Sequence, residues 1–254
     1  MDTFNEFDTQ GTAPQRNLSD IISHGFNHYV KIIGWSILII ILIAIVSSLV
    51  STLLGSLVGY NQLEAQAQME DMMSGGSMNP TDAITQMMSV PGYKESIILS
   101  YVFGLLLYPV YAGFVYAMHK VNTGQSVGFG DFFIGFRQNT VQYIVYGLIM
   151  GICLMIAAML CVIPVFFVLP LFFLGIPIIL FENASATASL SKSFNIAKAN
   201  YGTLLGVSFV AFLICIAGII LCGIGILATA PFFYAAMYSA YVAYNGVPRQ
   251  IAQS

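Results

Sequence analysis

Long apolar runs alternate with short polar segments along this chain. The first run covers residues 32–59 and includes the uncharged stretch WSILIIILIAIVSSLV; the second covers residues 97–118. Because a helix needs about 20 apolar residues to cross the hydrocarbon core of a bilayer, each run predicts one transmembrane helix. Residues 141–181 and 202–244 are also free of charge, and each is long enough for two helices.

Turn residues divide each of these two longer runs. Pro164 marks the first division, because proline is tolerated in the first turn of a helix. The glycine-rich segment CGIG, residues 222–225, marks the second. The predicted fold is therefore an all-α membrane protein whose spans are residues 32–59, 97–118, 141–162, 164–181, 202–222 and 224–244, with a loop of residues 60–96 between the first two.

The composition agrees with this membrane assignment. Hydrophobic residues make up 58% of the 254 residues and charged residues only 7%, whereas a soluble domain carries about 25% charged residues. A formal net charge of −3 offers no basic surface for nucleic acid, so nucleic acid is excluded as a partner. We expect membrane lipids to surround the chain, together with a protein partner or a second copy.

Lysine and arginine set the expected orientation, because they concentrate in cytoplasmic loops. With six spans and a cytoplasmic N-terminus, Lys94 is the only basic residue placed outside, in an otherwise acidic loop. The pattern predicts a multi-pass protein of the cytoplasmic membrane with both termini cytoplasmic. The basic residues placed inside are Arg16, Lys31, Lys120, Arg137, Lys192, Lys198 and Arg249.

A short amphipathic stretch precedes each odd-numbered span, at about residues 18–31, 130–139 and 186–199. In the first stretch, apolar residues recur at helical spacing on one face and polar residues occupy the other. Such helices lie flat at the membrane surface, so each stretch predicts an interfacial helix on the cytoplasmic side.

These elements suggest three copies of one unit, each made of an interfacial helix, a span, a turn and a second span. Cys161 and Cys222 are followed at the same spacing by Pro170 and Pro231, and Pro109 lies at the matching place in the second span. A unit with two spans returns to its starting side, so the copies would be parallel and related about an axis along the membrane normal.

The third copy carries a family resemblance. FENASATASLSKSFNIAKANYGTLLG, followed by CGIGILATAP, resembles an uncharacterised bacterial family of polytopic membrane proteins related to the membrane domain of glycerophosphodiester phosphodiesterases. In that family an acidic residue closes a span, Ala and Ser follow, and Lys-x-Asn enters the next span. The resemblance covers the last third of the chain and implies a polytopic inner-membrane protein without a catalytic phosphodiesterase domain. The matching positions here are Glu182, Ala188, Ser193, Lys198 and Asn200.

The three repeated prolines are the main candidates for a functional path. A proline inside a helix frees a backbone carbonyl, which a neighbour, water or a solute must satisfy. Pro109, Pro170 and Pro231 could therefore open three helices around a central cavity. The favoured alternative is that they are packing kinks inherited through duplication, since proline is frequent in membrane helices.

Two other groups could hold a metal ion, although the simpler interpretation is favoured for both. His24 and His28 share one face of the first interfacial helix, but no third ligand is evident and a stable zinc site wants three or four. The outer loop is rich in methionine, which suits Cu(I) but is also an adaptable packing residue. We therefore expect no cofactor. The methionines are Met69, Met72, Met73, Met78, Met87 and Met88.

Known catalytic patterns are absent from the sequence, and no ionisable residue lies between the ends of a predicted span. We therefore expect a protein without catalytic activity that organises the membrane or binds lipid or a partner. The alternative is a transporter or facilitator of an apolar or weakly polar solute through the pseudo-threefold centre. An intramembrane enzyme would need a buried acid, base or metal, which the sequence does not supply.

Overall fold

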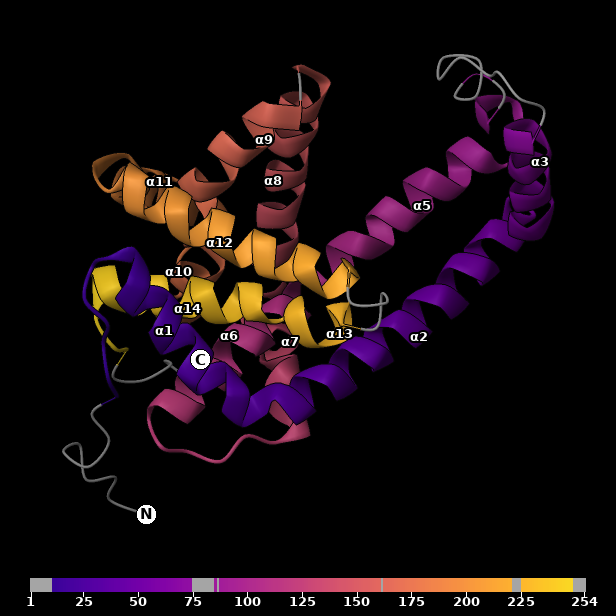
Figure 1. The fold of residues 1–254 in the computed structure, drawn as a ribbon. Helices are drawn as coiled ribbons and strands as arrows, with labels where there is room; N and C mark the ends of the chain where they lie inside the picture. The colour runs from indigo at the N-terminus through magenta and orange to yellow at the C-terminus, as the bar shows by residue number, and fades with distance from the viewer. Residues whose placement is uncertain (1–10, 75–84, 86, 161, 221–224, 249–254) are drawn as a thin grey trace. The chain divides into compact units, whose positions relative to one another are not determined.

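The computed structural model describes residues 11–74, 85, 87–160, 162–220 and 225–248 (Figure 1). Over these residues the chain forms helices and connecting turns, with no strand. The 3₁₀ helices are η1 (Val30–Ile32), η2 (Phe129–Phe133) and η3 (Leu169–Phe172). The α helices are α1 (Leu18–Tyr29), α2 (Ile33–Leu57), α3 (Gln62–Ser74), α5 (Tyr93–Leu106), α6 (Tyr108–Asn122), α7 (Ile134–Arg137), α8 (Thr140–Leu160), α9 (Val162–Val168), α10 (Gly175–Glu182), α11 (Ala186–Ala199), α12 (Tyr201–Ile220), α13 (Ile226–Thr229) and α14 (Phe232–Asn245).

Six helical segments in the described part of the chain are long and apolar enough to cross a membrane. This confirms the prediction of an all-helical, multi-pass membrane protein. The predicted turn at residues 222–224 lies outside the described residues, as does Cys161. The segments are Leu18–Leu57, Tyr93–Asn122, Thr140–Leu160, Ile163–Glu182, Tyr201–Ile220 and Ile226–Asn245.

The chain divides into two compact units, and each is described by itself. One unit contains residues 1–40 and 107–254, and the other contains residues 41–106. In the smaller unit, the turn after α2 meets the chain just before α5. Gly92 has a φ of +72° there, and a side chain on it would collide with the carbonyl of Val58. Glycine is therefore required at this turn, for both its left-handed backbone and its close approach.

Helix α14 lies at the centre of the larger unit, where it contacts α1, α6, α10, α12 and α13 (Figure 1). Its buried face carries small residues, among them Ala235, Ser239 and Ala243. Small residues let helix backbones approach closely, which favours packing inside a membrane, where burial of apolar surface drives little association. On α1, Gly25 meets this face: a Cβ at Gly25 would lie 3.3 Å from the Ser239 hydroxyl and 3.4 Å from the Ala235 carbonyl.

The segment η2–α7 packs directly against α6 through two glycines. Gly113 on α6 touches the backbone of Phe132, and Gly135 on α7 touches the backbone of Pro109. A Cβ at Gly113 would collide with the carbonyl oxygen of Phe132, and one at Gly135 would collide with that of Pro109. Because both obstacles are backbone atoms, neither contact can be relieved by a side-chain rotation.

We predict that Gly113→Ala destabilises the protein by roughly 1–3 kcal/mol, the usual cost of overpacking a well-packed core. The thermal unfolding midpoint of the protein in mild detergent measures this loss. Gly202→Ala on α12 is the matched control, since its Cβ would meet nothing within 4 Å. An unchanged midpoint for Gly113→Ala would show that α6 and η2 are not in close contact.

Candidate functional site

The three candidate prolines lie where the second, fourth and sixth spans change helix. Pro109 is in the first turn of α6, Pro170 lies in η3 between α9 and α10, and Pro231 is the N-cap residue of α14. All three are buried. Because the N–H groups of a first turn have no partner within the helix, proline can begin a new helix segment there without breaking an intrahelical bond.

Carbonyl groups near two of these breaks are bonded by side chains from other helices. The Tyr146 hydroxyl on α8 donates to the carbonyl of Phe172 at 2.7 Å, and the Tyr201 hydroxyl on α12 donates to that of Phe167 at 2.9 Å. The Tyr29 hydroxyl on α1 donates to the carbonyl of Ala228. In hydrocarbon an unpaired carbonyl costs several kcal/mol, so these hydroxyl groups stabilise the broken helices.

The break at Pro109 is covered in a different way. Its carbonyl faces Gly135 at close range, so α7 lies directly over the start of α6. The carbonyl of Leu107 accepts hydrogen bonds from the backbone N–H groups of Val110 and Tyr111, at 2.9 and 3.3 Å. The start of α6 is thus bonded within its own first turn.

Ser193, one of the residues singled out by the family resemblance, closes the break at η3. It is fully buried on α11. Its hydroxyl donates to the carbonyl of Leu171 at 3.0 Å and accepts from the backbone N–H of Leu174 at 3.1 Å. A single side chain therefore satisfies one orphan acceptor and one orphan donor where η3 passes into α10.

Glu182 ends α10 and joins it to two other helices. Its carboxylate forms an ion pair with Lys192 on α11 at 2.6 Å and accepts a hydrogen bond from the Tyr241 hydroxyl on α14 at 3.1 Å. The next residue, Asn183, has a φ of +52°, a left-handed conformation that commonly ends a helix. The glutamate therefore fixes the end of the fourth span against α11 and α14.

Of the other three residues of the resemblance, Ala188 is exposed on α11. Asn200 is the C-cap of α11, and its side-chain amide donates to the carbonyl of Ile196 at 3.0 Å. Lys198 is exposed on α11. The structure does not bring Glu182, Ser193, Lys198 and Asn200 together at one site: Ser193 contacts η3, Glu182 contacts α14, and Asn200 bonds within its own helix.

A buried polar cluster, which we call the Tyr238 cluster, joins the end of α6 to the middle of α14. It consists of His119 and Asn122 on α6 and Tyr238 on α14. The Tyr238 hydroxyl accepts a hydrogen bond from the Asn122 side chain at 2.9 Å and lies 3.2 Å from His119 Nδ1. Each of the three side chains is at least nine-tenths buried.

The N-terminal segment attaches to this cluster. The Thr12 backbone N–H and hydroxyl both donate to Asn122 Oδ1 at 2.9 Å, and the Asn122 amide donates back to the Thr12 carbonyl. On α1, His24 Nε2 lies 3.0 Å from the same carbonyl and Nδ1 lies 2.9 Å from the Ser239 hydroxyl. Both ring nitrogens of His24 therefore already have partners within the protein.

These bonds also bear on the two candidate metal groups. Within the described residues, no three of His, Cys, Asp and Glu are arranged to hold a metal ion. His28 Nδ1 lies 2.7 Å from the carbonyl of His24, one turn before it in α1. The side chains of Met69, Met72 and Met73, and Met78 as a whole, lie outside the described part of the chain, so a copper site in the outer loop stays a hypothesis.

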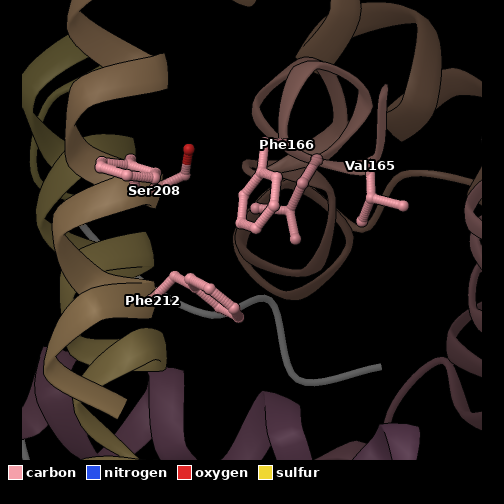
Figure 2. Close-up of a pocket in the computed structure, with 6 residues that line it drawn as sticks. Val165, Phe166, Ser208 and Phe212 are labelled. Carbon is pink, nitrogen blue, oxygen red and sulfur yellow. The ribbon is translucent and has the colours of Figure 1, made fainter. Parts of the chain in front are cut away.

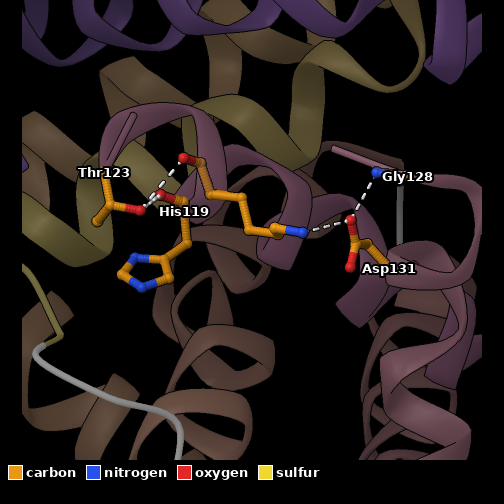
Figure 3. Close-up of polar contacts among 5 residues, drawn as sticks. His119, Thr123, Gly128 and Asp131 are labelled. Carbon is orange, nitrogen blue, oxygen red and sulfur yellow. Dashed lines mark hydrogen bonds and ion pairs between the residues drawn. The ribbon is translucent and has the colours of Figure 1, made fainter. Parts of the chain in front are cut away.

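A second polar group fastens η2 to the end of α6 (Figure 3). The Lys120 ammonium forms an ion pair with Asp131 at 2.8 Å, and the same carboxylate oxygen accepts from the Gly128 N–H at 2.7 Å. On the other side, the Thr123 hydroxyl donates to the carbonyl of His119 at 3.0 Å. These contacts close the turn at residues 123–128 and neutralise the charge of Asp131.

An apolar cavity of about 150 Å³ lies between α9 and α12 (Figure 2). The ring centroids of Phe166 and Phe212 lie 5.1 Å apart, edge to face, beside this space. Among the described residues that line it, the only polar side chain is Ser208, whose hydroxyl donates to the carbonyl of Leu205 at 3.1 Å. A polar solute would find no unpaired side-chain group in this lining.

Comparison with known protein families, with curated proteins and with solved structures finds no match for this chain. The resemblance of its last third to a family of polytopic membrane proteins therefore stays a prediction. The function of the chain has to be inferred from its own geometry, in particular from the closed helix breaks, the buried polar clusters and the cavities.

No pattern in the sequence predicts that five polar residues form one group: Thr12, His119, Asn122, Tyr238 and Ser239. Tyr238 and His119, for example, are 119 positions apart in the chain but in contact in the structure. One signal could have indicated them: polar residues at the inner ends of apolar spans need partners, because leaving them unpaired in a membrane protein is costly.

We predict that Ser193→Ala lowers stability by roughly 1–3 kcal/mol, because it leaves a buried carbonyl and a buried N–H without a partner. Chemical or thermal unfolding in mild detergent measures the effect. Ser191→Ala, on the exposed side of the same helix, is the control and is expected to be neutral. Equal stability of the two variants would contradict the role given to Ser193.

We also predict that Tyr238→Phe destabilises the protein by roughly 1–3 kcal/mol, since His119 and Asn122 lose a buried partner. Tyr116→Phe is the matched control: Tyr116 is only half-buried and forms no hydrogen bond within the described residues. Limited proteolysis before α1 should be faster in Tyr238→Phe alone. The same rate in both variants would argue against the Tyr238 cluster as the anchor of the N-terminal segment.

Proposed function

We propose that this chain is a non-catalytic component of the cytoplasmic membrane that binds lipid or a protein partner and organises the bilayer around it. The observation that carries the proposal is the closure of the helix breaks: hydroxyl groups of Tyr29, Tyr146, Ser193 and Tyr201 bind carbonyls of α9, η3 and α13. A transport path needs such groups to face a solute or water.

The outer surface of the spans supports the same proposal. Large apolar side chains are exposed along α8, α9 and α12, for example Met155, Ile163 and Leu213. In a multi-pass protein, such surface is covered by lipid chains or by an apolar helix of a partner. Several polar side chains, in contrast, are bonded inside the protein, as the Tyr238 cluster and the Tyr146 hydroxyl illustrate.

The distribution of basic residues along the sequence supports the proposed orientation, with both termini in the cytoplasm. Lys31 precedes α2, and Lys120 and Arg137 lie near the ends of α6 and α7, in segments that the proposal places in the cytoplasm; Lys94, near the start of α5, is in the segment that it places outside. The interfacial role of α1, η2–α7 and α11 belongs to the same proposal. The amphipathic sequences and the cytoplasmic assignment of their flanking charges support it.

Purification in mild detergent followed by native mass spectrometry, together with vesicle swelling, tests the proposal. We expect phospholipid or a protein partner to remain bound at a fixed ratio. Vesicles containing the protein should swell no faster in glycerol than protein-free vesicles. Swelling that is accelerated by the protein and slowed by Pro170→Ala or Pro231→Ala, with folding intact, would overturn the proposal in favour of a facilitator.

A further inference from the structure

A cavity of about 350 Å³ lies between η1 with the start of α2 and the turn after α6. Lys31 and Trp35 line one side, and Gln125 and Ser126 line the other. The cavity far exceeds the roughly 10–15 Å³ that a single water requires, so it has room for a polar group of several heavy atoms. The remaining lining residues are Ile32, Val121, Gly124 and Val127.

The cavity lies at a membrane boundary. Lys31 is the last charged residue before α2, whose sequence from Ile33 to Leu57 contains no charge. Trp35 follows one helical turn later, and tryptophan is enriched where membrane helices meet the headgroup region. The opening is therefore at the level of the lipid headgroups, on the side assigned to the cytoplasm.

The cavity offers positive charge and hydrogen-bond donors. Lys31 is exposed, and the ion pairs found among the described residues involve Lys120 and Lys192 instead. No acidic residue is among the described residues that line the space, and the nearby carboxylate of Asp131 is neutralised by Lys120 at 2.8 Å. The side chains of Gln125 and Ser126 are exposed and form no hydrogen bond within the described residues.

An apolar surface leads away from this charge along the helix. Lys31, Trp35 and Leu38 follow one another at helical spacing, so they share one stripe. Trp35 is 38% exposed and Leu38 is 47% exposed. A cation followed by an indole ring and an aliphatic side chain matches an anionic headgroup followed by an acyl chain. A soluble anion such as free phosphate would use only the first part of this stripe.

We propose that this cavity binds the headgroup of an anionic phospholipid. The lipid phosphate lies against Lys31, with Gln125 and Ser126 as hydrogen-bond donors, and an acyl chain follows Trp35 and Leu38. This inference rests on the proposed lipid-binding function and names the lipid class and the residues that select it.

Trp35 is the only tryptophan in the chain, so its fluorescence reports directly on this site. We expect brominated phosphatidylglycerol, added to the purified full-length protein in detergent, to quench Trp35 more strongly than brominated phosphatidylcholine. Lys31→Gln should weaken phosphatidylglycerol binding about fivefold, since one lysine near an anionic surface contributes about 1 kcal/mol. Lys94→Gln is the matched control, with the same charge change at an exposed position near the start of α5, which the proposed orientation places outside.

Each remaining outcome overturns the inference. Equal quenching by the two lipids, or equal weakening by Lys31→Gln and Lys94→Gln, shows that the cavity does not select an anionic headgroup. Displacement of the brominated lipid by inorganic phosphate shows that the site takes a soluble anion instead. If either result is found while native mass spectrometry still detects bound phospholipid, the headgroup site is refuted and the proposed function stands. If native mass spectrometry detects neither bound lipid nor a bound partner, the headgroup site and the proposed function are both refuted.

Discussion

The absence of water in the hydrocarbon core is the constraint on which this structure depends, because every backbone carbonyl there needs a partner within the protein. Unbroken helices such as α8 and α12 meet this requirement alone. The second, fourth and sixth spans are broken, and the described breaks are closed by hydroxyl groups or by close helix packing, with Ser193 and Tyr146 bonded around η3. The apolar spans can therefore bend without exposing polar backbone to lipid.

A second requirement is close contact between helices that gain little from burying apolar surface. Helix α14 meets it with a face of alanine and serine, and α1 with Gly25. Hydrogen bonds and an ion pair then fix where the helices contact one another. Asn122 and Tyr238 join α6 to α14, and Glu182 joins α10 to α11 and α14. Packing brings the helices together, and these few polar pairs set their register.

The spans could be predicted from sequence because each is a continuous apolar run, and the six candidate helices confirm that prediction. The prolines Pro109, Pro170 and Pro231 indicate where the helices break. The side chains that bind the freed backbone groups could not be predicted, because they come from other helices. Tyr201, for example, bonds Phe167 across 34 positions in the chain. The cavity beside Trp35 was equally hidden, because Gln125 and Ser126 carry no pattern of their own.

The contacts of α1 also bear on how the chain is assembled. Arg16 donates to the carbonyl of Ala243 at 3.1 Å, a separation of 227 positions, and His24 meets Ser239 across 215. During synthesis, α1 therefore leaves the ribosome long before α14 and can dock on it only after α14 has been made. Until then the face of α1 around Gly25 lacks its partner on α14. Helix α14 thus supplies a large part of the surface on which α1 docks, and a chain truncated before residue 232 would lack it.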